Sequence, residues 1–319
     1  MQGNKLMETT LSIRNVESSL QEERTFIFYF PVTPIDTVAS ILSFTASATF
    51  LIVLYLTKSY KHKLHKMVFF LLFADFLHKL SYIITFIHPP TSEVECKIVF
   101  AIAFFGRDSS FFWSVLFAYV LLKIVEAQDF SPSTMKMRYF YLIAVYLPLF
   151  LSLAMVLSPL VTYNTDNEKC GRYETVGQFD YAYFLISGMP LMFSWLLSIF
   201  FYLLTGCRLK ILFVGTILKT REALFLVLYP IILIVCWGPN LAWSLISMIT
   251  KPNSAYLVIP KTCLALHGLL NSLVYGLSPK TRQDIKNLCT RGGQKESFQQ
   301  TQALISMKEE NPYDDKIVV

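Results

Sequence analysis

Ionisable side chains interrupt three of the long apolar stretches in this sequence. Asp75, His78 and Lys79 occupy one stretch, and their spacings of three and four residues place them on one face of a helix. Two further groups occur in later stretches: Arg107–Ser110, and His267 with Asn271. Because an ionisable group at membrane depth costs at least about 2.5 kcal/mol on insertion scales, such groups are candidates for function. Their carboxylate, guanidinium, imidazole and hydroxyl groups suit either a ligand pocket or a polar network between helices.

The surrounding sequence has the composition of a membrane protein. Of its 319 residues 54% are hydrophobic and only 16% are charged, and its mean hydropathy is +0.48. The net charge of +6 would suit nucleic acid, but the basic residues lie mainly between apolar runs, so we expect no nucleic-acid partner. Seven runs are long enough to cross a bilayer as helices: 35–57, 64–87, 94–125, 139–161, 180–205, 222–250 and 256–277. We therefore predict an all-α membrane protein, with a seven-transmembrane helix bundle at residues 35–277.

Lysine and arginine are distributed unevenly between the two sides of this expected bundle. Fourteen lie near the membrane in one set of loops and six in the other, so the first set should be cytoplasmic. Residues 1–34 then form an extracellular segment, 278–290 a short amphipathic helix on the inner membrane surface, and 291–319 a disordered cytoplasmic tail. We expect a multi-pass protein of the plasma membrane, surrounded by its lipid, with the N-terminus outside.

Three cysteines are informative in this topology. Cys96 and Cys170 both lie on the outer side, where a disulfide between them can persist; two free thiols are the alternative. Cys289 follows the amphipathic stretch SPKTRQDIKNL after the last apolar run. It is a candidate for palmitoylation, and an unmodified cysteine is the alternative.

The sixth run contains an uncharged segment with two internal prolines, Phe225–Ile249. In a membrane helix, neighbouring helices can satisfy the carbonyl groups that Pro230 and Pro239 leave unpaired. Trp237 stands two residues before Pro239. We expect a bend at this proline, with the tryptophan as a side-chain pivot.

The polar groups divide into two predicted sites. Candidates for ligand binding are Arg107, Asp108, Trp237 and His267. A switch network below them is expected to contain Asp75, Trp237, Pro239, Asn271 and Tyr275. Internal salt bridges, such as Arg107 with Asp108 or Asp75, are the alternative for the charged groups. His267 also suits a hydrogen-bonded packing role.

Short motifs in this sequence resemble those of G-protein-coupled receptors. Cys236–Pro239 (CWGP) resembles the CWxP element of the sixth receptor helix. Asn271–Tyr275 (NSLVY) resembles the NPxxY element with serine in place of proline, and Leu71–Asp75 (LLFAD) is similar to the LxxAD element of the second helix. The outer pair, Cys96 and Cys170, matches the receptor disulfide.

Two further motifs resemble a particular group of receptors. Asp108–Ser114 (DSSFFWS) and Leu266–Gly268 (LHG) look like the slime-mould cyclic AMP receptors and their animal relatives. The sequence departs from rhodopsin-like receptors in lacking an asparagine in the first helix and an Asp/Glu-Arg-Tyr end of the third, where Lys123–Glu126 (KIVE) lies instead. The resemblance implies a receptor that binds an extracellular ligand and activates a heterotrimeric G protein through movement of the sixth helix. Arg107 would suit a small anionic ligand.

Other function classes remain as alternatives. A transporter or channel would also use intramembrane charges. A retinal protein would need a lysine deep in the last run, where Ala265 stands, and a zinc enzyme would need clustered ligands, although only His78 and His267 lie at depth. We therefore expect no enzyme activity, no cofactor and no metal.

Overall fold

The structure, a computed structural model, describes residues 24–28, 34–61, 63–127, 136–159, 161–164, 169–175, 181–213, 221–249, 258–278, 281–283, 285–286 and 290. Most of the predicted N-terminal segment, part of the predicted surface helix with Cys289, and the predicted tail at 291–319 lie outside these residues.

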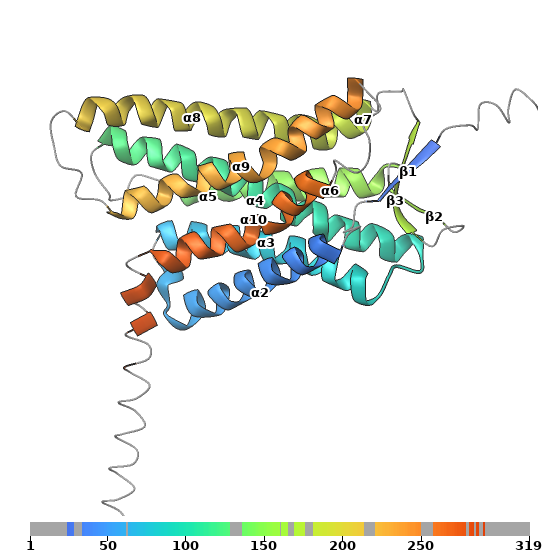
Figure 1. Ribbon diagram of the computed structural model, residues 1–319, viewed down its shortest axis with the longest axis horizontal. Coiled ribbons are helices and arrows are strands. Elements are labelled where there is room, and N and C mark those ends of the chain that lie inside the picture. Colours follow the sequence, from blue (N-terminus) through green and yellow to red (C-terminus); the bar gives the residue numbers. More distant parts are fainter. Residues whose placement is uncertain are drawn as a thin grey trace, which may run out of the picture.

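Long helices make up most of the described chain and lie side by side along its length (Figure 1). The longest are α2 (Pro34–Leu56), α3 (Lys63–Ile87), α4 (Glu93–Ala127), α8 (Met189–Phe213), α9 (Arg221–Ile249) and α10 (Val258–Leu277). A short 3-10 helix, η1 (Ser59–Lys61), lies between α2 and α3. Two composite helices complete the set: α5 (Met137–Tyr141), η3 (Leu142–Tyr146) and α6 (Leu147–Leu157), then α7 (Tyr181–Tyr183) and η4 (Phe184–Gly188), which continue into α8.

Five of the helical segments are long and apolar enough to cross a membrane: Pro34–Leu56, Lys63–Ile87, Glu93–Glu126, Met137–Leu157 and Phe184–Arg208. Within the described residues, α9 adds a shorter apolar stretch, Ile231–Ala242. The prediction of a helical, multi-pass membrane protein is confirmed at this level.

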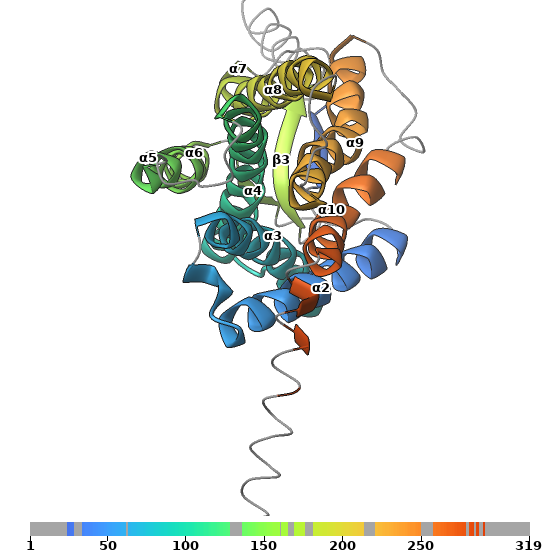
Figure 2. The same cartoon turned by 90° about the vertical axis from the view of Figure 1, so that its left-hand side faces the viewer.

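The helix α4 is the most buried of the five long apolar helices. It contacts α3, α6, α8 and α9. Viewed along the helices, α2, α3, α4, α8, α9 and α10 form a ring, and the composite helix with α5 and α6 lies outside it beside α4 (Figure 2). Its position lets α4 connect α3, α8 and α9 with the composite helix outside the ring.

Two segments of π-helix, η3 and η4, interrupt the composite helices and end two residues before a proline. Pro148 has no N–H to bond the carbonyl of Ala144 in η3, and Pro190 likewise has none for the carbonyl of Ile186 in η4. A π-helical turn accommodates such a break without ending the helix.

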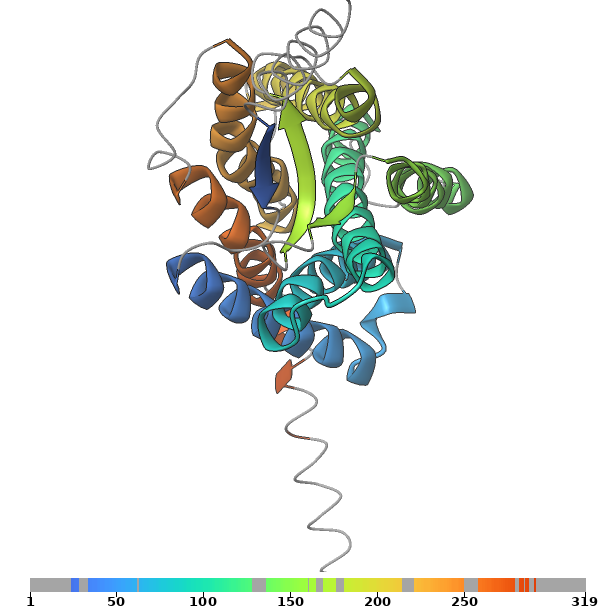
Figure 3. The ribbon, with the colours of Figure 1, turned by 90° about the vertical axis from the view of Figure 1, so that its right-hand side faces the viewer.

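A small antiparallel sheet lies across one end of the ring (Figure 3). Its strands are β1 (Arg24–Phe28), β2 (Thr162–Asn164) and β3 (Lys169–Thr175), in the order β1-β3-β2. The all-helical prediction lacked this sheet. A disulfide joins Cys170 of β3 to Cys96 near the start of α4, with a Cα–Cα distance of 5.5 Å, so the predicted disulfide is confirmed.

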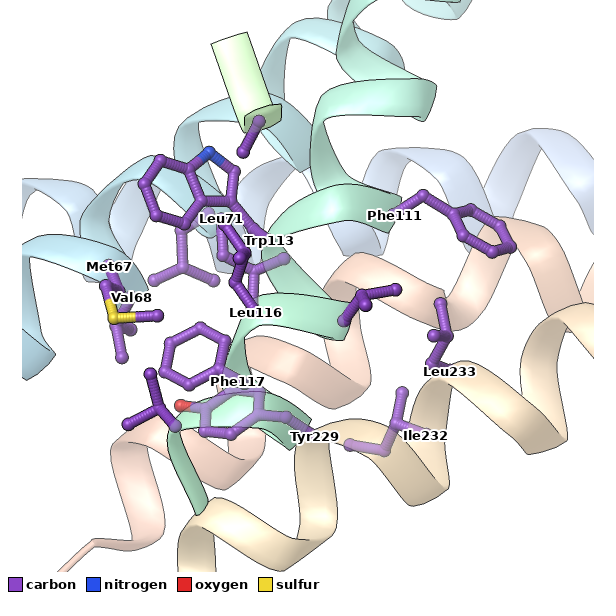
Figure 4. Packing of buried hydrophobic residues seen from close by; sticks show 14 of the residues in the cluster. Met67, Val68, Leu71, Phe111, Trp113, Leu116, Phe117, Tyr229, Ile232 and Leu233 are labelled. Atoms are coloured by element: carbon purple, nitrogen blue, oxygen red, sulfur yellow. The ribbon is translucent and has the colours of Figure 1, made fainter. Parts of the chain in front are cut away.

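The packed core lies mainly between α3, α4 and α9 and is rich in aromatic side chains (Figure 4). Phe117 of α4 stacks on Tyr229 of α9 with ring centroids 4.8 Å apart. Trp113 stacks on Phe70 of α3 at 5.5 Å. Offset aromatic pairs of this kind add to the stabilisation from burial alone, which holds α4 firmly against both neighbours.

Candidate functional site

Asp75 is the centre of a buried polar network. Its Oδ1 accepts a hydrogen bond from Ser110 Oγ at 2.6 Å and lies 3.2 Å from Nδ1 of His267. Its Oδ2 accepts a hydrogen bond from Nδ2 of Asn271 at 2.8 Å. Only 2% of Asp75 is exposed, and its partners come from α4 and α10. The carboxylate therefore connects three helices inside the bundle.

Glycine allows the helices to approach closely enough for these bonds. A Cβ on Gly106 of α4 would lie 2.6 Å from the backbone nitrogen of His78, and a Cβ on Gly268 of α10 would lie 3.2 Å from Cβ of Asp75. The first distance is shorter than real Cβ atoms show, and the second is tight enough that Asp75 would have to shift. Glycine at these two positions is thus what brings α4 and α10 within hydrogen-bonding distance of α3.

Trp237 of α9 joins this network through ring contacts. It is 2% exposed and meets the ring of His267 edge-on at 6.3 Å. Phe111 of α4 also meets the Trp237 ring edge-on, at 4.2 Å. Trp237, the predicted pivot, is therefore linked to Asp75 through the side chain of His267.

The two remaining residues of the predicted switch network lie at its margins. Pro239 is partly buried, and α9 continues through it as a helix. Tyr275 is buried one turn after Asn271 and makes edge-on contacts with Phe50 at 5.8 Å and His65 at 6.1 Å. The contact with Phe50 links α10 to α2, and the contact with His65 links α10 to α3.

Arg107 and Asp108, predicted as ligand contacts, bind each other. Nε of Arg107 lies 2.8 Å from Oδ1 of Asp108, which is 1% exposed. The guanidinium also donates to Oγ of Ser187 in η4 at 3.0 Å and lies 3.8 Å above the ring of Phe104. This geometry corresponds to the alternative of an internal salt bridge.

The neighbouring basic groups of α3 point to backbone and ring partners. Nζ of Lys79 donates to the carbonyl oxygen of Leu264 in α10 at 3.1 Å and lies 5.1 Å from the ring of Tyr82. Nδ1 of His78 lies 3.0 Å from the carbonyl oxygen of Ala103 in α4. Both side chains are buried, so the face of α3 predicted from the spacing is directed into the bundle.

A row of small polar residues on α2 was missed from the sequence. Ser40, Ser43 and Ser47 are all at most 2% exposed, and Oγ of Ser47 lies 3.4 Å from Oγ of Ser272 in α10. Their spacing of three and four residues within an apolar run was the available signal. The row lies against α10, where a Cβ on Gly268 would meet Oγ of Ser43 and Ser47.

The comparisons leave the site to be interpreted from its geometry. No family model matches the chain, and no curated protein matches it. Among the described residues there is no group of three or more His, Cys, Asp or Glu side chains that could hold a metal ion. What the arrangement offers is a buried carboxylate, an imidazole, an amide and an indole in one connected path.

Proposed function

We propose that this chain is a G-protein-coupled receptor, in which an extracellular ligand shifts the equilibrium between two arrangements of the helices. The observation that carries the proposal is the connected path from Asp75 through His267 to Trp237. It joins α3 and α10 to the proline-containing helix α9. A hydrogen-bonded network that can adopt more than one arrangement couples two binding sites, because a ligand at either site shifts the equilibrium between the arrangements.

The proposed topology has seven crossings, namely α2, α3, α4, the helix from α5 to α6, the helix from α7 to α8, α9 and α10. The disulfide and the sheet would mark the extracellular end, because disulfides persist in oxidising compartments. The opposite end carries Lys61 after α2 and Arg138 in α5, as expected for the cytoplasmic side.

The mechanism follows from differential affinity. A ligand that binds the active arrangement more tightly than the resting one shifts the population toward it. In the proposed receptor, the change at Trp237 and His267 alters the bonds to Asp75 and lets the inner end of α9 move. A G protein would then bind between the inner helix ends.

The test is nucleotide exchange on a panel of Gα subunits in membranes that contain the protein. Trp237→Leu removes the ring contacts to Phe111 and His267. The matched control is Trp113→Leu, which removes an equally buried indole that stacks on Phe70, away from the network. The proposal expects exchange on at least one subunit, changed by Trp237→Leu and retained by the control at equal expression.

A transporter is the second candidate, and one feature favours it. Lys79 is buried, and within the described part of the chain no carboxylate lies at ion-pair distance from it. Charged side chains at membrane depth occur in ion pathways as well as in structural networks. Solute or ion flux through reconstituted protein, together with no exchange on any Gα subunit, would replace the receptor proposal with this one.

A further inference from the structure

The three strands of the sheet are attached to the helices in different ways. β3 is joined to α4 by the disulfide between Cys170 and Cys96, and both β2 and β3 contact α4. Among the described elements, β1 has its main contacts with β3 alone. A covalent bond therefore fixes β3, whereas β1 depends on its pairing with β3.

β1 extends the sheet over the part of the ring end that lies beside α9 and α10. Seen from both ends of the bundle, β1 (dark blue) lies on the side of β3 that faces these two helices (Figures 2 and 3). The register runs from Arg24 opposite Thr175 to Phe28 opposite Gly171, so the whole of β1 is paired with β3. Without β1, the sheet would end at β3, and this part of the ring end would lose its cover.

The length and position of β1 make its pairing reversible. β1 has five residues and lies at the edge of the sheet. In an antiparallel pair, only alternate residues of an edge strand direct their N–H and C=O groups toward the neighbouring strand, so few bonds hold β1. A pairing of two strands alone is at most marginally stable in water. Segments of this kind open locally while the rest of a protein stays folded.

We propose that β1 is a strap that opens and closes over the end of the ring that carries the disulfide. In the closed arrangement, which the structure shows, β1 is paired with β3. In the open arrangement β1 separates, while the disulfide holds β3 on α4. Opening gives water-soluble molecules access to the ring end beside α9 and α10. Its use in admitting a ligand rests on the proposed receptor function, whereas the opening itself does not.

A native cysteine can report this opening. Cys263 is a free, half-buried thiol in the second turn of α10, and α10 begins on the side of the ring nearer the sheet (Figure 1). Cys207 of α8 is a free, exposed thiol and serves as the control for the reagent. Labelling of the full-length protein in lipid nanodiscs with a water-soluble maleimide, measured at each cysteine by mass spectrometry, follows both thiols together.

Proline substitutions along β1 test the strap with neighbouring positions as matched controls. Proline lacks an N–H group, so it breaks the pairing only where the replaced N–H pointed toward β3. Because these directions alternate along the strand, Thr25→Pro and Ile27→Pro should behave alike, and Phe26→Pro should behave oppositely. The variants that break the pairing should label Cys263 at least about tenfold faster than the wild type, because a minor open state is populated at roughly 10% or less.

The remaining variants should label Cys263 at the wild-type rate, and Cys207 should label equally in every protein. Equal rates of Cys263 labelling across the three proline variants, whether raised or not, would overturn the proposal.

Hydrogen exchange of the wild-type protein tests the strap without any substitution. The backbone amides of β1 should exchange at least about tenfold faster than those of β2, which pairs with the other edge of β3 and contacts α4. Equal protection of the two strands would overturn the proposal. Nucleotide exchange on the Gα panel with the same proline variants separates the two proposals. Faster labelling of Cys263 in the pairing-deficient variants, without exchange on any subunit, would reject the receptor function and support the strap.

Discussion

The hydroxyl of Ser110 offers the sharpest test of the network. It donates to Oδ1 of Asp75 at 2.6 Å, and both residues are 2% exposed. A hydrogen bond to a charged group contributes about 1.5–3 kcal/mol. Ser110→Ala should therefore lower the free energy of unfolding by about 2 kcal/mol.

Ser114→Ala is the matched control. Ser114 lies one turn further along α4 and is equally buried, but its hydroxyl bonds the carbonyl oxygen of Ser110 in its own helix at 3.0 Å. That carbonyl already belongs to the helical hydrogen-bond ladder, so the expected loss is below about 1 kcal/mol. The assay is the thermal unfolding midpoint of the purified protein in detergent, where Ser110→Ala should show a decrease of a few degrees.

A double-mutant cycle identifies the partner. In the background of Asp75→Asn the charge is gone, so Ser110→Ala should cost about 1 kcal/mol less than in the wild type. Equal decreases for Ser110→Ala and Ser114→Ala, or a full additive loss in the double variant, would refute the argument that Asp75 holds α4 through this hydroxyl.

Three further variants probe the packing, the ion pair and the disulfide. Gly268→Ala should destabilise the protein by about 1–3 kcal/mol, because the new methyl group would lie 2.5 Å from Oγ of Ser43; Gly206→Ala, where the methyl group meets nothing within 4 Å, should have no such effect on the thermal midpoint. Arg107→Ala leaves Asp108 buried and unpaired and should cost about 3–5 kcal/mol, and adding Asp108→Ala should restore part of the midpoint; a double variant no better than Arg107→Ala would contradict the pairing. Cys170→Ser should make Cys96 reactive to a thiol reagent in the denatured protein and lower the free energy of unfolding by about 2–5 kcal/mol. Cys207→Ser removes an exposed free thiol and should change neither quantity. Labelling of Cys96 in the denatured, unreduced wild type would show that the disulfide is not formed.

The sequence predicted the five membrane-length helices and the inward face of α3, because both depend on local periodicity. Asp75, His78 and Lys79 share a face at helical spacing, and all three are buried. The disulfide could be predicted because the distribution of basic residues placed both cysteines on the same side of the membrane. These inferences required no knowledge of which helices touch.

Contacts between helices could not be predicted in the same way. The spacing of His267 and Asn271 indicated one face of α10, but it did not indicate that this face would meet Asp75 and Ser110. The sheet was missed because β1 pairs with β3 across about 145 residues, and nothing in a short strand specifies so distant a partner. For Arg107 the sequence left the partner open between two carboxylates, and only the packing selects Asp108.

The four consecutive polar residues of α4, Arg107–Ser110, each face a different part of the structure. Successive residues on a helix point about 100° apart, so Arg107–Ser110 sweep almost a full turn. Arg107 reaches Ser187 in η4, Ser109 donates to the carbonyl oxygen of Ala144 in η3 at 2.6 Å, and Ser110 reaches α3. A helix with one face toward lipid could not satisfy such a run, whereas α4 contacts α3, α6, α8 and α9.

The bond from Ser109 also connects this run to the prolines. The carbonyl of Ala144 is the one that Pro148 leaves without its helical partner, and the hydroxyl of Ser109 supplies the missing donor. On the other side of α4, Ser187 lies beside Ile186, whose carbonyl is freed by Pro190. Both π-helical segments therefore contact the polar turn of α4, and in η3 the hydroxyl of Ser109 takes the place of a regular helical donor. The irregular backbone and the polar cluster form one structural unit, and a change in either must be accommodated by the other.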